Sequence, residues 1–168
     1  LIYVVLPVNA SAFGISLAWV GVLLAANRIV RTFSYGIIAA LGERIGFKGL
    51  CVLASLTALA STAMYGLFQG WAPLLTARVL WGLSYGSLIL ATLGYAAADR
   101  SRTGTRVGVS RAVEQVGPLV ALMGGAWLAG VVGPRDVFFY LAFVSSIAVF
   151  LALFLPGMPT RSKASSSD

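Results

Sequence analysis

Long apolar runs alternate with short polar breaks along almost the whole chain. After an apolar stub at residues 1–7, the apolar spans cover 17–41, 49–69, 72–97, 107–131 and 137–155. Each span is close to the ~20 residues that a helix needs to cross a bilayer core of ~30 Å. Lipid offers the backbone no hydrogen-bond partners, so segments of this length have to cross as helices. The pattern predicts an all-α membrane protein, with about six transmembrane helices of which the first is partial.

The polar breaks contain residues that end helices. Gly42 and Gly46 fall in the first break, and the later ones read QGWAP (69–73), DRSRTGTR (99–106) and GPRD (133–136). Residues 156–168 are polar and rich in serine, which predicts disorder. The sequence therefore predicts two parts, a transmembrane helical bundle over 1–155 and a disordered polar cytoplasmic tail over 156–168.

Composition supports a bilayer as the solvent. Hydrophobic residues make up 59% of the chain and charged residues only 10%, whereas soluble domains carry about 25% charged residues. The chain begins with Leu1 and the stub has no signal-peptide pattern, so we expect that the first helix lacks its front end. The absence of histidine and the single cysteine, Cys51, predict neither a metal site nor a cofactor.

The basic residues indicate an orientation in the membrane. One set of breaks and the tail carry Arg44, Lys48, Arg100, Arg102, Arg106, Arg111, Arg161 and Lys163, while the opposite loops carry only Arg135. The positive-inside rule then predicts that loops 42–48 and 98–106 and the tail are cytoplasmic. Most of the net charge of +7 is therefore a topology signal, and we do not expect nucleic acid as a partner.

Three motifs resemble signatures of the major facilitator superfamily. AALGERIGFKG (39–49) is similar to the family's loop between its second and third helices, and its matching positions are Glu43, Arg44, Gly46 and Lys48. It departs from the family pattern at Glu43, where Asp is usual, and at Phe47, where Arg is usual. RVLWG (78–82) resembles the fourth-helix signature. GPLVALMGG (117–125) resembles the fifth-helix signature through Gly117, Pro118, Gly124 and Gly125.

The resemblance implies the amino-terminal half of a twelve-helix secondary transporter. LLAANRIVRTF (23–33) is also similar to the second helix of bacterial efflux permeases. We expect alternating access, with the 42–48 loop as a conformational switch and the Gly-Pro face at an interdomain surface. The implied partners are the bilayer, a small organic solute, protons and a second six-helix half. The implied function is proton-coupled efflux across a bacterial inner membrane.

A polar stripe lies where lipid should exclude it. The spacing of three and four residues places five polar side chains on one helix face: Asn27, Arg28, Arg31, Thr32 and Tyr35. Arg28 is ~15 Å deep at 1.5 Å per residue, and a central arginine costs ~2.5–3.5 kcal/mol even on the lenient insertion scale. The stripe is therefore expected to line a cavity, either as a cationic wall for an anionic group or as a structural partner of an acid in the first helix.

Two further charged residues lie inside apolar spans. Arg78, with Tyr85 beside its face, is a cavity candidate. The resemblance implies that it contacts the first helix near a proton site, and a structural anchor to backbone carbonyls of the first helix is the alternative. Glu114 is the one acid well inside a span, which makes it the proton-coupling candidate. A local ion pair with Arg111, three residues earlier, is the interpretation that we favour.

Enzyme activity is not expected. GLSYG (82–86) fits the nucleophile-elbow pattern, but that chemistry needs a base, usually histidine, and the chain has none. Two alternatives to a transporter half remain open: a half-transporter that assembles with itself, and a structural membrane subunit that does not transport.

Overall fold

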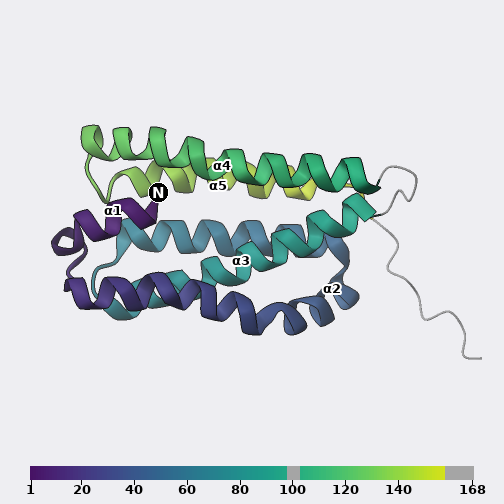
Figure 1. Cartoon of the computed structure of the whole chain (residues 1–168), viewed down its shortest axis with the longest axis horizontal. Coiled ribbons are helices and arrows are strands. Elements are labelled where there is room, and N and C mark those ends of the chain that lie inside the picture. Colours follow the sequence, from purple (N-terminus) through teal and green to yellow (C-terminus); the bar gives the residue numbers. More distant parts are fainter. Residues whose placement is uncertain (98–102, 158–168) are drawn as a thin grey trace, which may run out of the picture.

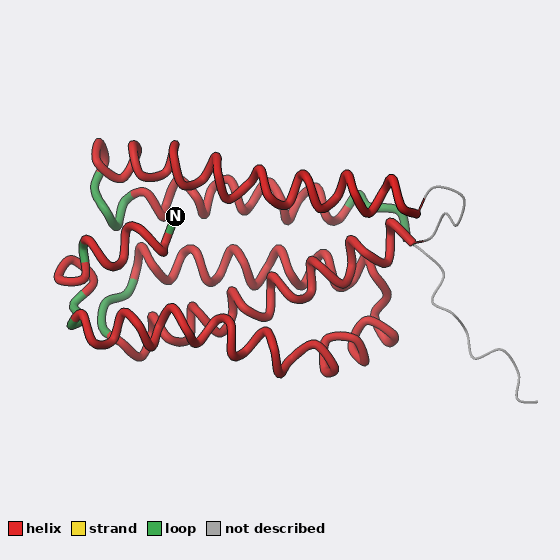
Figure 2. Tube along the Cα trace, viewed as in Figure 1, coloured by secondary structure: helices red, strands yellow, loops and turns green. Residues whose placement is uncertain are grey.

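The computed structural model describes residues 1–97 and 103–157, which form helices without a strand. The elements in order are α1 (Ile2–Val8), the short 3-10 helix η1 (Ala10–Phe13), α2 (Leu17–Leu67), α3 (Trp71–Ala97), α4 (Thr103–Val132) and α5 (Val137–Leu153). Figures 1 and 2 show the long helices lying side by side in one bundle. The predicted all-α architecture is confirmed. Arg100, Arg102 and the predicted tail from residue 158 onward lie outside the described residues.

The element α2 is a hairpin of two helical arms. Gly46 alone leaves helical geometry, with φ 74° and ψ 170°, and the helix resumes directly after it. The first arm (17–45) and the second arm (47–67) run in opposite directions in Figure 1. A positive φ of this size is strained for any residue with a Cβ, which explains why glycine occupies the turn. The predicted loop over 42–48 is therefore too long, because only one residue is non-helical.

Connections fall at the two ends of the bundle. The turn of α2, the end of α3, the start of α4 and the end of α5 share one end in Figure 1, and η1 and the α4–α5 connection share the other. Arg44 and Lys48 flank the turn and Arg106 lies in the first turn of α4, so they belong to the first end, whereas Arg135 belongs to the second. The charge asymmetry along the sequence thus becomes an asymmetry in space. The cytoplasmic location of the basic end stays a prediction.

Helix boundaries differ from the predicted ones in three places. α4 begins at Thr103, so the last residues of the predicted 98–106 loop are helical. α5 ends at Leu153, two residues before the predicted end of that span, and is shorter than the other apolar helices. η1 follows the amino-terminal stub, where the polar sequence had predicted no element. α2, α3 and α4 are long and apolar enough to cross a membrane.

The second arm of α2 packs closely against α3. Ala54 and Ala77 are almost fully buried there. The Ser84 hydroxyl donates a hydrogen bond to the Ala54 carbonyl at 2.7 Å, and the Ser61 hydroxyl donates one to the Ala77 carbonyl at 2.7 Å. Small side chains let two backbones approach closely, and hydroxyl-to-carbonyl bonds then join the helices without water.

Buried polar residues separate two apolar clusters. One cluster gathers α1, η1 and the adjacent helix ends and includes Leu6, Phe13 and Phe138. The other lies toward the α2 turn and includes Ile38 and Leu50. On α3, the residues between the two clusters include three buried polar side chains, those of Arg78, Ser84 and Ser87. The middle of the bundle is therefore its polar part, and the candidate site lies there.

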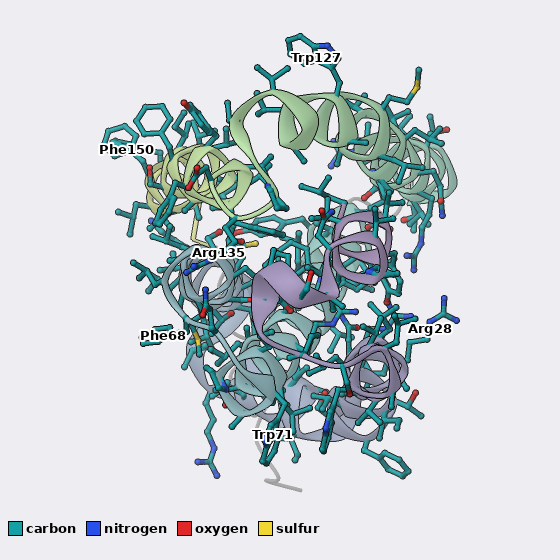
Figure 3. The ribbon with its side chains drawn as sticks, turned by 90° about the vertical axis from the view of Figure 1, so that its left-hand side faces the viewer. Arg28, Phe68, Trp71, Trp127, Arg135 and Phe150 are labelled. Carbon is teal, nitrogen blue, oxygen red and sulfur yellow. The ribbon has the colours of Figure 1, made fainter. Side chains whose placement is uncertain are left out.

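The outer helices expose apolar side chains. α4 has no buried residue, and α5 buries only Val137, Phe138 and Ala152. Trp127 of α4 and Phe150 of α5 project from the periphery in Figure 3, and they are 70% and 61% exposed. Surfaces of this kind are unfavourable in water and favourable against lipid chains.

Candidate functional site

Arg78 is the most deeply buried charged residue in the described part of the chain. Its side chain is 1% exposed, and its Nε donates a hydrogen bond to the Leu23 carbonyl at 3.0 Å. Its guanidinium lies over the ring of Tyr3, 5.0 Å from the centroid. The predicted anchor to a backbone carbonyl is therefore present, but the carbonyl belongs to the first arm of α2 instead of the first helix. The first helix is contacted through Tyr3.

The surroundings of Arg78 leave hydrogen-bonding groups unused. Its Nη2 is buried without a hydrogen-bond partner, and so is the hydroxyl of Tyr65, which lies within electrostatic range of the guanidinium. No described carboxylate pairs with Arg78. A buried guanidinium is stable only where its charge and its donors are compensated. The Arg78 guanidinium and the Tyr65 hydroxyl are thus two neighbouring buried polar groups without a carboxylate partner among the described residues.

The polar stripe on the first arm of α2 is only partly buried. Asn27 is 5% exposed, Arg31 and Tyr35 are half-buried, and Arg28 and Thr32 are exposed. Figure 3 shows Arg28 pointing away from the bundle. The Thr32 hydroxyl donates to the Arg28 carbonyl at 2.9 Å, within its own helix.

Arg31 connects the stripe to α3. Its guanidinium lies over the Tyr85 ring, 4.8 Å from the centroid, in a cation–π arrangement. The methylene chain of Arg31 and the Tyr35 ring also lie close to Gly86 of α3, where a Cβ would be 3.8 Å from Arg31 Cγ and 3.7 Å from the Tyr35 ring. Arg31, Tyr35 and Tyr85 therefore form one group, although the sequence had placed Tyr85 beside Arg78. The structure does not bring Arg28 into contact with it.

The turn of α2 places its charged residues at the basic end of the bundle. Glu43 and Arg44 are exposed, and Lys48 is half-buried. No ion pair or hydrogen bond joins the side chains of these three residues to one another. The predicted switch role of this loop stays a prediction.

Phe47 has a contact that the family motif did not predict. Its ring covers Gly94 of α3 so closely that a Cβ at Gly94 would overlap it, and it lies 6.2 Å from the Tyr95 ring. The Tyr95 hydroxyl donates to the Pro156 carbonyl at 2.8 Å. Phe47, which departs from the family motif, thus packs the α2 turn against the end of α3. The end of α3 also contacts the segment after α5.

Glu114 forms the ion pair with Arg111. Arg111 Nη1 and Glu114 Oε2 are 2.7 Å apart, and the Glu114 side chain is 20% exposed. The Thr92 hydroxyl of α3 lies 3.4 Å from Glu114 Oε1, a long hydrogen bond that links α3 to α4. The favoured ion pair is present, and the proton-coupling role stays a prediction.

The predicted interdomain face of α4 is open in the described residues. Gly117, Pro118 and Gly124 are exposed, and a Cβ at Gly117 or Gly124 would meet nothing within 4 Å. Gly125 differs, since a Cβ there would lie 2.6 Å from the Leu1 side chain. Of the three signature glycines, Gly125 is therefore the one that lies close to another segment of the chain.

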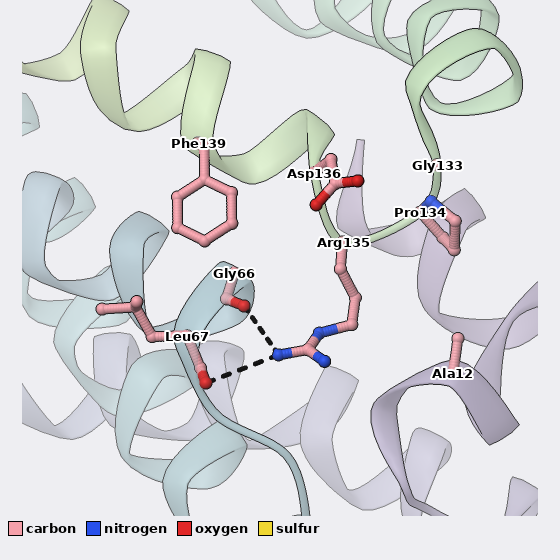
Figure 4. A pocket seen from close by; sticks show the side chains of 8 residues that line it. All are labelled: Ala12, Gly66, Leu67, Gly133, Pro134, Arg135, Asp136 and Phe139. Atoms are coloured by element: carbon pink, nitrogen blue, oxygen red, sulfur yellow. Dashed lines mark hydrogen bonds between the residues drawn. The ribbon is translucent and has the colours of Figure 1, made fainter.

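At the opposite end of the bundle, Arg135 joins the α4–α5 connection to the carboxyl end of α2. Its Nη2 donates to the carbonyls of Gly66 and Leu67 at 2.7 and 3.4 Å, so it satisfies acceptors at the carboxyl end of α2 (Figure 4). The surrounding pocket has a volume of about 600 Å³ and also involves Asp136 and Gly133, whose φ is 110°. Sequence reasoning treated Arg135 only as a loop charge.

The described residues form a helical bundle with long apolar helices and arginines inside its apolar spans, which is typical of membrane proteins with a functional site in the bilayer. The Major Facilitator Superfamily model matches residues 1–168, the whole chain, and the chain belongs to that superfamily. The comparison with curated proteins gave no match. The protein is therefore an integral membrane protein of a secondary transporter family, as the three motifs predicted.

Sequence reasoning missed Tyr3 and Tyr65 beside Arg78. Both are aromatic residues in apolar runs, and nothing in their spacing separates them from ordinary core positions. Gly94 was also missed, although a glycine inside a helix is a signal of close packing. Ser84, the central residue of the nucleophile-elbow pattern, donates its hydroxyl to a helix carbonyl and so has a packing contact.

Proposed function

We propose that this bundle is the amino-terminal half of a transporter that moves a small organic solute by alternating access, in the direction of proton-coupled efflux. A second six-helix half is the proposed partner, and solute would bind between the two halves. In this fold, substrate sites lie at the interface of the repeats near the bilayer midplane. The bacterial inner membrane is the proposed location, with the basic end of the bundle in the cytoplasm.

The observation that carries the proposal is the set of arginines in the membrane-spanning arms. Arg78 is buried without a carboxylate partner among the described residues, Arg31 stacks on Tyr85, and Arg28 is exposed on the same arm of α2 as Arg31. Each guanidinium in a bilayer core costs at least ~2.5 kcal/mol. That cost is offset if the α2–α3 face meets a water-filled cavity, an anionic solute group or an acid of a partner bundle. An ordinary lipid-facing surface offers none of these.

Proton coupling is assigned to Glu114. The carboxylate is half-buried and bonded to Arg111 and Thr92, so its ion pair can open when the proton binds. Replacement by Gln in the assembled transporter should abolish solute movement against its gradient while exchange of solute between the two sides continues. Loss of both activities at normal protein level would instead assign Glu114 to solute binding or folding.

The proposal is tested by flux in proteoliposomes. Vesicles with this chain alone should show no saturable flux of any solute in a panel of radiolabelled organic cations and anions, since a site between two halves would be incomplete. Vesicles with the chain and a six-helix partner half should show saturable flux that depends on a pH gradient. No flux with both halves present would contradict the proposal.

The alternative of a self-assembling half-transporter has one observation in its favour. The exposed glycines of α4 offer a face on which a second copy could pack closely. Saturable flux from the chain alone, together with a dimer in detergent by light scattering, would establish that alternative. A stable dimer without flux would favour a structural subunit.

A further inference from the structure

A groove runs down the second arm of α2 from the Gly46 turn. It has a volume of about 630 Å³, and its lining includes Gly46, Lys48, Val52, Leu56 and Gly157. Val52 and Leu56 are four and eight residues beyond Lys48, so the groove extends ~12 Å along the helix at 1.5 Å per residue. Gly157, which follows α5, also lines it.

The groove has two chemically different parts. Lys48 is the charged residue of its lining, and it lies at the start of the second arm of α2, two residues after Gly46. Below it the wall is apolar and open, with Leu56 47% exposed. A ligand that matches this surface carries an anionic head and an apolar chain.

Lys48 is available for such a ligand. Its ammonium has no hydrogen bond or ion pair with another described residue. Glu43 and Arg44 precede the turn with opposite charges, and both are exposed outside the groove. The net positive charge of the turn is therefore that of Lys48, inside the groove.

We propose that this groove is a binding site for an anionic phospholipid. The phosphate lies at the Lys48 ammonium, and one acyl chain lies along Val52 and Leu56. Basic pockets between transmembrane helices bind anionic lipid head groups in this way. Because Gly46 lines the same groove, the bound lipid contacts the hinge of α2. The proposal requires only that the chain spans a membrane, so it does not depend on the proposed transport function.

Lipid titration of the purified chain in detergent tests the proposal. Retained lipid is counted by native mass spectrometry, with dioleoylphosphatidylglycerol as the anionic probe and dioleoylphosphatidylcholine as the zwitterionic one. Lys48→Gln should weaken phosphatidylglycerol binding about fivefold, the effect of ~1 kcal/mol for one lysine near an anionic head group. Lys48→Arg should restore binding. Arg44→Gln is the matched control, because it removes the same charge from the same turn outside the groove, and it should bind as the unchanged chain does.

Two further arms distinguish a lipid seated in the groove from anions attracted to the protein surface in general. Leu56→Gln leaves the charge intact and should also weaken phosphatidylglycerol binding, since it places an amide along the acyl chain. Glycerol 3-phosphate, which has the phosphate without the chains, should not compete. Equal losses in Lys48→Gln and Arg44→Gln would overturn the proposal in favour of general surface attraction. Equal retention of phosphatidylcholine, or competition by glycerol 3-phosphate, would overturn it as well.

Discussion

Replacement of Gly82 by alanine should destabilise the bundle, because Gly82 lies where α3 approaches the backbone of α2 closely. A Cβ at Gly82 would lie 3.0 Å from the Asn27 carbonyl oxygen and 3.3 Å from Val30 Cγ1. A backbone oxygen cannot rotate away as a side chain does, so the first arm of α2 has to shift. Overpacking of this kind costs ~1–3 kcal/mol, which exceeds the ~1 kcal/mol that alanine gains over glycine in a helix.

Gly36→Ala is the matched control for this experiment. Gly36 lies in the first arm of α2, where a Cβ would meet nothing within 4 Å. Both variants gain the same helix propensity, so the difference between their melting temperatures isolates the packing cost. At roughly 2–4 °C per kcal/mol, Gly82→Ala should melt several degrees below Gly36→Ala in detergent. Equal melting temperatures would refute the close approach of α2 and α3. The packing that positions Arg78, one turn away on α3, would then be refuted as well.

Three further outcomes follow from the contacts at the α2 turn and the ends of the bundle. Gly94→Ala displaces the Phe47 ring, so trypsin should cleave this variant faster after Arg44 and Lys48. Gly108→Ala is the control, because a Cβ at Gly108 would meet nothing within 4 Å. Equal cleavage rates in the two variants would mean that Phe47 does not hold the turn. In the assembled transporter, Glu43→Gln should lower the maximal transport rate more than the apparent solute affinity, because the turn acts on the equilibrium between conformations. A large loss of affinity with an unchanged maximal rate would instead place Glu43 in the solute-binding site. The third outcome concerns topology and uses a chain in which Cys51 is replaced by Ser. Gly104→Cys should resist an impermeant thiol reagent added outside intact cells, whereas Pro134→Cys should react with it. The opposite labelling would show that the predicted topology is inverted.

The sequence predicted the helices well because lipid leaves few alternatives. An apolar run of ~20 residues has to be a helix in a bilayer, and the five spans appear at nearly their predicted positions. The turn at Gly46 was predictable from glycine chemistry, but its sharpness was not. Whether one residue or seven leave the helix depends on contacts of neighbouring side chains, such as Phe47 with Gly94, that no local pattern contains.

The charged residues of the candidate site were predictable from the sequence, but the contacts that they make were less so. Lipid excludes arginine, so Arg28, Arg31 and Arg78 were identifiable from position alone. Their partners were not, because helical periodicity says which residues share a face and not which helix covers it. Arg78 was expected to contact the first helix and does so through the Tyr3 ring, but its backbone hydrogen bond goes to Leu23 of the first arm of α2.

The most direct measurement of the central claim is solute flux after replacement of Arg31 in the assembled transporter. Ser55→Ala serves as the control, since that hydroxyl bonds to the Cys51 carbonyl in its own helix. Arg31→Gln should lower the saturable flux at least about tenfold at unchanged protein level, because a charged hydrogen bond contributes ~1.5–3 kcal/mol. Arg31→Lys should restore part of the flux. Normal flux in Arg31→Gln, matching that of Ser55→Ala, would contradict the claim that this face of α2 and α3 lines the transport pathway.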